Sequence, residues 1–223
     1  MLEIENLRAG YDRAERLHGV SARFRPGTLT AIIGPNGCGK TTLLKCAAGL
    51  LKPWSGEIRL DGENYARMEP REVARRAAYM PQSRVAPGIS VRRLAEHGRY
   101  PYLRFGHDLS AEDRRIVSEA LRRAGMEDKS ASAVSRLSGG ERQRAYIAMM
   151  LAQEAKLLLL DEPTTYLDPA AQFMVMELLS ALAREGRAVA AVLHDLPLAM
   201  RYADRVLLMR GGEIALDGTP EEL

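Results

Sequence analysis

A glycine-rich loop between a strand and a helix constrains this fold more than any other feature. The segment Gly34-Pro-Asn-Gly-Cys-Gly-Lys-Thr matches the pattern G-x-x-x-x-G-K-[ST] in full. An apolar stretch typical of a strand (28–34) precedes it, and residues 41–51, which have helical spacing, follow it. Glycines let successive backbone N–H groups point at one anion, and the helix N-terminus adds partial positive charge. The loop therefore predicts a nucleoside triphosphate site.

The last two residues of the pattern have separate expected roles. Lys40 supplies a mobile positive charge to the outer phosphates. The Thr41 hydroxyl suits Mg²⁺, which takes few protein ligands and keeps several waters. A glycine-rich turn that binds nothing is the alternative, and the correct context on both sides of the loop disfavours it.

Strands and helices alternate after this loop. The strand-like stretches 156–162, 188–194 and 205–210 are separated by stretches with helical spacing at 170–185 and 195–203. Such alternation predicts a mostly parallel sheet covered on both faces. We expect one α/β domain, in which a nucleotide-binding core is interrupted by a helical subdomain. The expected core comprises residues 1–86 and 154–223, and the helical subdomain residues 87–153.

Two carboxylates follow the uninterrupted apolar run at 157–160. Asp161 and Glu162 at the end of a buried strand are costly unless they find partners. Beside a phosphate loop, the Asp usually holds the Mg²⁺ shell. Glu162 points the other way and is placed to polarise an attacking water. Taken singly, His194 and Gln82 are more typical of a packed residue and a loop residue.

Composition restricts the setting in which this chain works. Lys and Arg number 32 against 29 for Asp and Glu, and the basic residues are scattered, so we expect no nucleic-acid partner. The two cysteines, Cys38 and Cys46, indicate no disulfide framework and fit a reducing compartment. No secretory signal is visible, and no stretch approaches the roughly 18–20 apolar residues of a membrane span.

The segment Leu137-Ser-Gly-Gly-Glu-Arg-Gln143 changes the interpretation of the whole chain. Ser138 and Glu141 form an S-x-x-E capping box for the next helix. With the loop and the acidic pair in the same order, the chain resembles the ABC ATPases over essentially its whole length. The resemblance implies an α/β P-loop NTPase fold of the ABC type. It has a RecA-like core, an N-terminal antiparallel β subdomain and a helical signature subdomain.

The resemblance also implies site residues. The expected catalytic residues are Glu162, His194 and Gln82, and the expected metal ligands are Thr41, Gln82 and Asp161. Tyr11 is expected to stack on adenine, and Asp168 lies in the short loop that crosses a dimer. The expected nucleotide-binding residues are Tyr11, Gly34, Pro35, Asn36, Gly37, Cys38, Gly39, Lys40, Thr41, Thr42, Ser138, Gly139, Gly140, Gln143 and Asp168.

Partners follow from the same resemblance. It implies ATP and Mg²⁺ as ligands, and a head-to-tail dimer of two such chains, expected to be identical, with two ATPs between them. It also implies separate transmembrane permease subunits and, indirectly, a substrate-binding protein. The chain would then be cytoplasmic and peripheral on the inner face of the cell membrane. The stretch around residues 80–105 is expected to form the groove that docks on the permease.

The segment 88–106 and the sequence EPTTYLD are similar to importers for iron–siderophore complexes, haem and vitamin B12. An iron–siderophore or related metal chelate is the preferred cargo, with haem, cobalamin and other cargoes as alternatives. A non-transport ABC ATPase that acts on DNA or ribosomes is a second class. Such proteins typically carry long coiled coils or two ATPase domains in one chain. An exporter is a third class, and it usually has a fused membrane segment.

Overall fold

A computed structural model describes residues 1–83, 86–103 and 107–222. Its central feature is a six-stranded sheet with the strand order β10-β9-β3-β8-β7-β6, in which every neighbouring pair is parallel except β9 and β10. The strands are β3 (Leu29–Ile33), β6 (Ala77–Met80), β7 (Leu157–Asp161), β8 (Ala188–Val192), β9 (Arg205–Arg210) and β10 (Glu213–Gly218). The predicted, mostly parallel α/β sheet is thus confirmed.

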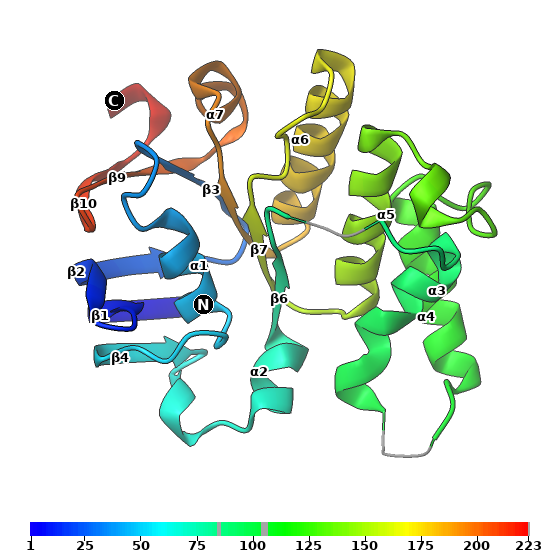
Figure 1. Ribbon diagram of the computed structural model, residues 1–223, viewed down its shortest axis with the longest axis horizontal. Helices are drawn as coiled ribbons and strands as arrows, with labels where there is room; N and C mark the ends of the chain where they lie inside the picture. The colour runs from blue at the N-terminus through cyan, green and yellow to red at the C-terminus, as the bar shows by residue number, and fades with distance from the viewer. Residues whose placement is uncertain (84–85, 104–106, 223) are drawn as a thin grey trace.

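A second sheet of four antiparallel strands has the order β2-β1-β4-β5. Its strands are β1 (Leu2–Tyr11), β2 (Ala14–Phe24), β4 (Ser55–Leu60) and β5 (Glu63–Asn64). β1 and β2 form one long antiparallel hairpin. This sheet is the antiparallel N-terminal part that the resemblance implied, and it lies at the opposite end of the molecule from α3, α4 and α5 (Figure 1).

Between β6 and β7 every regular element is helical in the described part of the chain. These helices are α3 (Val91–Glu96), α4 (Ala111–Arg123) and α5 (Gly139–Ala152), with 3₁₀ turns at His97–Tyr102 and Val134–Arg136. The remaining helices are α1 (Lys40–Ala47), α2 (Pro70–Arg76), α6 (Pro169–Arg184) and α7 (Leu196–Tyr202), with 3₁₀ turns at Tyr65–Arg67 and Pro220–Glu222. No helix in the described residues is both long enough and apolar enough to cross a bilayer.

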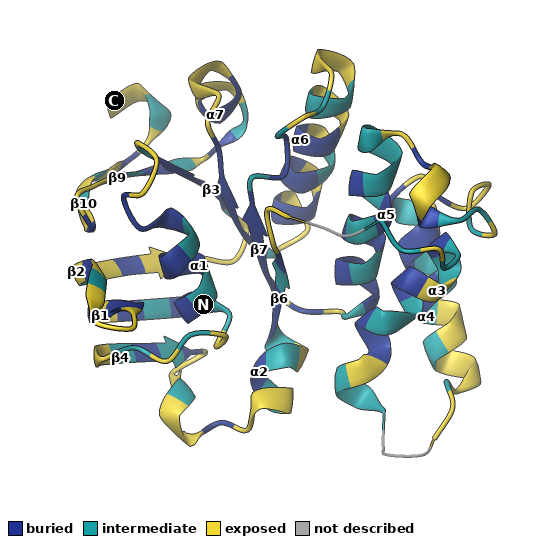
Figure 2. Cartoon of the chain, viewed as in Figure 1, coloured by how far each residue is buried: buried dark blue, intermediate teal, exposed yellow. Residues whose placement is uncertain are grey.

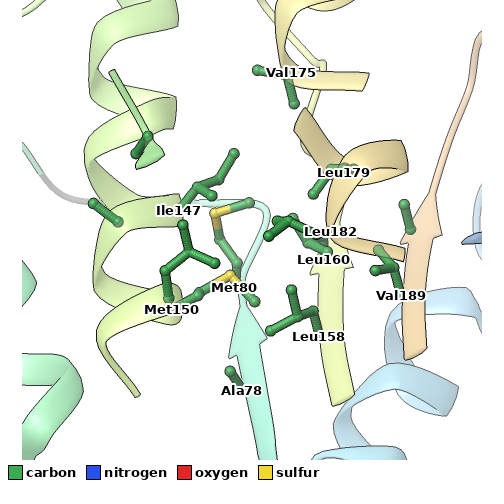
Figure 3. Packing of buried hydrophobic residues seen from close by; sticks show 14 of the residues in the cluster. Ala78, Met80, Ile147, Met150, Leu158, Leu160, Val175, Leu179, Leu182 and Val189 are labelled. Atoms are coloured by element: carbon green, nitrogen blue, oxygen red, sulfur yellow. The ribbon is translucent and has the colours of Figure 1, made fainter. Parts of the chain in front are cut away.

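Two hydrophobic cores lie on the two faces of the parallel sheet. Every residue of β3 and β7 is buried, as Figure 2 shows for the centre of the molecule. Because side chains alternate along a strand, Leu158 and Leu160 enter the core toward α5 and α6. Leu157 and Leu159 enter the other core, shared with α1 and the antiparallel sheet. In Figure 3, Met80 of β6 fills the space between α5 and β7.

This packing predicts that Leu159 matters far more to stability than a surface leucine. Leu159 is fully buried, so Leu159→Ala should lower the free energy of unfolding by about 2–5 kcal/mol through lost burial and a residual cavity. Leu50 is 64% exposed, and Leu50→Ala should change that free energy by no more than about 0.5 kcal/mol. Denaturant unfolding of both variants checks this. Equal losses would contradict the core assignment.

Candidate functional site

The phosphate loop connects the end of β3 to the start of α1. Gly34, Gly37 and Gly39 have φ angles of 142°, 79° and 105°, in a region that favours glycine. A Cβ atom at Gly34 would lie 2.1 Å from the carbonyl oxygen of Met209. One at Gly39 would lie 2.8 Å from the carbonyl oxygen of Arg16. The glycines at 34 and 39 are therefore required by conformation and by close backbone approach.

Lys40 folds its ammonium group back into this loop. Its Nζ donates to the carbonyl oxygens of Gly34 at 2.7 Å and Pro35 at 2.9 Å, and lies 3.9 Å from Cys38 Sγ. The side chain is almost completely buried. The Lys40 ammonium group is held by neutral carbonyls. It can leave them for the anionic oxygens of a ligand, because hydrogen bonds to anionic oxygens are stronger. The loop thus holds a cation in position for an anion.

Asp161, the last residue of β7, is a fully buried carboxylate. Its Oδ2 accepts a hydrogen bond from the Tyr79 hydroxyl at 3.3 Å, and its Oδ1 has no partner among the described residues. Burial raises the pKa of Asp161, and the Thr41 hydroxyl partly offsets this rise. A buried, unpartnered carboxylate oxygen beside a hydroxyl is a donor set that suits a hard divalent cation.

Glu162 gathers side chains from three parts of the fold. Its Oε1 lies 2.6 Å from Nε2 of His194, and its Oε2 accepts from Gln82 at 2.8 Å and Thr165 at 3.0 Å. Burial raises the pKa of Glu162. The hydrogen bonds from His194, Thr165 and Gln82 lower it by more, so it lies below its usual range. Glu162 is therefore ionised at neutral pH, although its side chain is only 11% exposed.

The phosphate loop and Glu162 border a cavity of about 780 Å³ at the carboxyl ends of the parallel strands, the usual place for a ligand in an open α/β sheet. The predicted residues that line it are Asn36, Gly37, Gly39, Lys40, Thr41, Thr42, Gln82, Glu162 and His194. The cavity is also lined by residues that were not predicted to bind the nucleotide: Arg16, Thr164, Thr165, Tyr166, Gln172 and Asp195. Thr165 and Tyr166 belong to the stretch 165–168 that the resemblance expects to cross a dimer. Of these, Thr165 follows the acidic pair closely enough for its hydroxyl to have been suspected.

The other predicted residues lie outside the lining of this cavity. Tyr11 ends β1 and is half-exposed, with Lys45 Nζ 5.4 Å from its ring centroid. Asp168 caps α6 by accepting a hydrogen bond from the Ala171 N–H at 2.9 Å. Gly34, Pro35 and Cys38 belong to the loop itself. Asp161, buried at the end of β7, is not among the residues that line the cavity.

The segment 137–143 spans the start of α5 and does not line the cavity of its own chain. Ser138 caps α5 in the predicted capping box with Glu141. Gly140 packs so closely on α6 that an added Cβ would lie 2.9 Å from Ala171 Cβ. Gln143 was predicted to bind the nucleotide, but it is 2% exposed and its Nε2 lies 3.7 Å from Met80 Sδ. Its amide therefore contacts the core rather than the cavity.

Comparison with known proteins agrees with this geometry. The sequence pattern of the ABC transporter family matches residues 17–165. The chain belongs to the ABC transporter family. It is 43% identical to a probable siderophore transport system ATP-binding protein of Bacillus subtilis, covering all of this chain and 82% of that protein. It is 44% identical to the ferric enterobactin transport ATP-binding protein of Escherichia coli, covering 98% of this chain and 82% of that protein.

A solved structure is similar in fold as well. It is a dimeric ATP-binding cassette in a post-hydrolysis state, bound to ADP and phosphate, with a TM-score of 0.84 and 27% identity. The match covers 99% of each chain. This ABC protein therefore has the cassette fold that its sequence motifs predicted.

The buried charge of Asp161 leads to a stability prediction. A raised pKa means that folding favours the protonated form, so the ionised carboxylate destabilises the fold at pH values above its folded pKa. Without nucleotide or metal, Asp161→Asn should stabilise the protein at pH 7 by about 1 kcal/mol. That advantage should vanish below the unfolded pKa of about 3.9. Denaturant unfolding across pH measures it, and Asp168→Asn, at an exposed site, is the control. A less stable Asp161→Asn variant at pH 7 would contradict the assignment.

Proposed function

We propose that this chain is the ATP-hydrolysing subunit of an importer for an iron–siderophore complex or a related metal chelate. The observation that carries the ATPase assignment is the Glu162 carboxyl group, held by Gln82 and His194 in the lining of the phosphate-loop cavity. Similarity over almost the whole chain to siderophore and enterobactin transport proteins supports the direction and the cargo.

Nucleotide binding follows from the loop. Its backbone N–H groups and the positive end of α1 attract the phosphates of ATP. Lys40 exchanges the Gly34 and Pro35 carbonyls for outer phosphate oxygens. Because this exchange replaces neutral acceptors with anionic ones, it favours the triphosphate over an empty loop.

The same cavity fits Mg²⁺. The unpartnered Asp161 Oδ1 and the neighbouring Thr41 hydroxyl are the groups that would hold it, with Gln82 as the third candidate. When bound, the ion supplies positive charge that offsets the negative charge on the phosphate oxygens. Gln82 donates its amide N–H to Glu162 in this structure, which leaves its amide oxygen as the atom for the ion.

Glu162 is the group that accepts a proton from the attacking water. Its lowered pKa keeps it ionised at neutral pH, as a base must be before the reaction. The three donors fix the orientation of the carboxylate, but they also occupy its oxygens. An ionised carboxylate has about four acceptor sites, so a water can still donate to Glu162 beside these three donors, and Gln82, an exposed residue, borders that position.

A second subunit completes the site in this proposal. Ser138, Gly139 and Gly140 are predicted nucleotide-binding residues, yet they do not line their own cavity. In a head-to-tail dimer they would meet the nucleotide of the other chain, together with Asp168 of the crossing loop. The dimeric cassette with ADP and phosphate supports such an assembly.

The permease, and through it a substrate-binding protein, are the remaining partners, and they place the chain at the cytoplasmic face of the membrane. The proposed docking groove is the stretch around 80–105, although residues 84, 85, 104 and 105 lie outside the described residues. Arg99 gives this stretch a rigid base, because its buried guanidinium pairs with Asp113 and Glu154, each at 2.8 Å. Tyr100 beside it is half-exposed and available for contact.

Glu162→Gln tests the catalytic assignment. The variant keeps the size of the side chain but removes the base, so ATP turnover should fall by roughly 10²–10⁴-fold while ATP binding persists. Phosphate release and equilibrium nucleotide binding measure the two effects separately. Glu119→Gln is the control, because Glu119 lies on α4 in a surface ion pair with Arg122, does not line the cavity and should leave the chemistry intact. Wild-type turnover in Glu162→Gln would rule Glu162 out as the base.

A further inference from the structure

Arg16 is an extra residue in the long β1–β2 hairpin. Ala9 pairs with Leu17, and its neighbour Gly10 pairs with Glu15, so Arg16 has no partner opposite it in β1. Such a β-bulge bends the strand and redirects a side chain, and bulges are frequent next to ligand sites. The bulge lies close to the hairpin turn, where Tyr11 pairs with Ala14.

The backbone of this bulge is held tightly against the phosphate loop. An added Cβ at Gly39, the residue before Lys40, would lie 2.8 Å from the Arg16 carbonyl oxygen. One at Gly212, in the turn between β9 and β10, would lie 2.7 Å from the same oxygen. Arg16 therefore sits where the antiparallel sheet meets the start of α1, and its position is fixed by two close glycine contacts.

Arg16 brings a positive charge that nothing in the described structure neutralises. It is exposed and lines the nucleotide cavity. Its neighbour Glu15 is already paired with Arg8, whose Nε lies 2.7 Å from Glu15 Oε1. Within the described residues Arg16 forms no ion pair, whereas Lys40, the other cation of the cavity, is engaged by carbonyls.

We propose that Arg16 is a nucleotide-contacting residue that binds the phosphate nearest the sugar. This inference rests on the proposed ATPase function. Tyr11, the expected adenine partner, lies on the same hairpin as Arg16, and Gly39 of the phosphate loop approaches the Arg16 backbone. When the base of a nucleotide lies at Tyr11 and its outer phosphates lie at Lys40, its inner phosphate lies next to Arg16.

Arg16→Ala tests the proposal through equilibrium binding of ATP and of ADP at low ionic strength. Both affinities should fall roughly tenfold, as expected for the loss of one charge-assisted hydrogen bond. Their ratio should stay unchanged, because both nucleotides carry the inner phosphate. Arg16→Lys should recover part of the loss, and high salt should shrink it by screening. Arg13→Ala, an exposed arginine in the same hairpin turn that does not line the cavity, is the matched control.

Lys40→Ala distinguishes a failure of the Arg16 proposal from a failure of the ATPase proposal. If Lys40→Ala loses nucleotide binding while Arg16→Ala binds as the wild type does, the Arg16 proposal is wrong and the ATPase proposal stands. A loss for ATP alone would place Arg16 on the terminal phosphate and overturn the assignment. Undiminished binding in Lys40→Ala would refute the ATPase site itself. Arg16→Gln, which keeps the hydrogen-bonding side chain without its charge, replaces Arg16→Ala if thermal unfolding shows that the alanine variant is misfolded.

Discussion

The placement of two acidic residues at the end of a fully buried strand governs the rest of this structure. β7 has apolar cores on both faces, so it is fixed at the centre of the molecule, and Asp161 and Glu162 leave it together. A carboxylate that emerges from such a strand is costly without donors. The neighbouring strands are parallel, so the chain segments that follow them reach the same edge and supply Gln82 and His194 to Glu162. The chemistry of the site is therefore a consequence of strand direction.

The antiparallel sheet and the helical insertion act on this edge from opposite sides. Through Arg16 and Leu17, the β1–β2 hairpin packs on Gly39 and so shapes the phosphate loop from one side. On the other side, the start of α5 packs on α6 close to Tyr166 and Leu167, next to the loop that carries Thr165. Tyr166 is 96% exposed and has a φ angle of 63°, a strained conformation for a tyrosine. Its exposure at the cavity rim agrees with the proposal that a second subunit covers this surface.

Much of this arrangement could be predicted because its signals are local. The strand at 205–210, the glycine-rich loop and the capping box at Ser138 depend on short stretches of sequence, and the structure contains all three. Helix α2 and strand β10 escaped prediction, because a short helix after Pro70 and an exposed edge strand carry weak periodicity. The position of Gln143 and the bulge at Arg16 could not be predicted, since both depend on contacts between segments distant in sequence. Strand register decides the bulge, and the packing of α5 on β6 decides that Gln143 is buried.

Co-purification with its partners tests most directly whether ATP hydrolysis in this cavity powers a membrane transporter. The Glu162→Gln variant would be tagged in its host, given ATP and Mg²⁺ and recovered from gently solubilised membranes, and Lys40→Ala would be the matched control. We expect to recover a polytopic permease, and with it a substrate-binding protein that binds an iron chelate. Recovery of ribosomes, nucleic acid or only non-membrane proteins would contradict the transport assignment, even if the ATPase chemistry were intact.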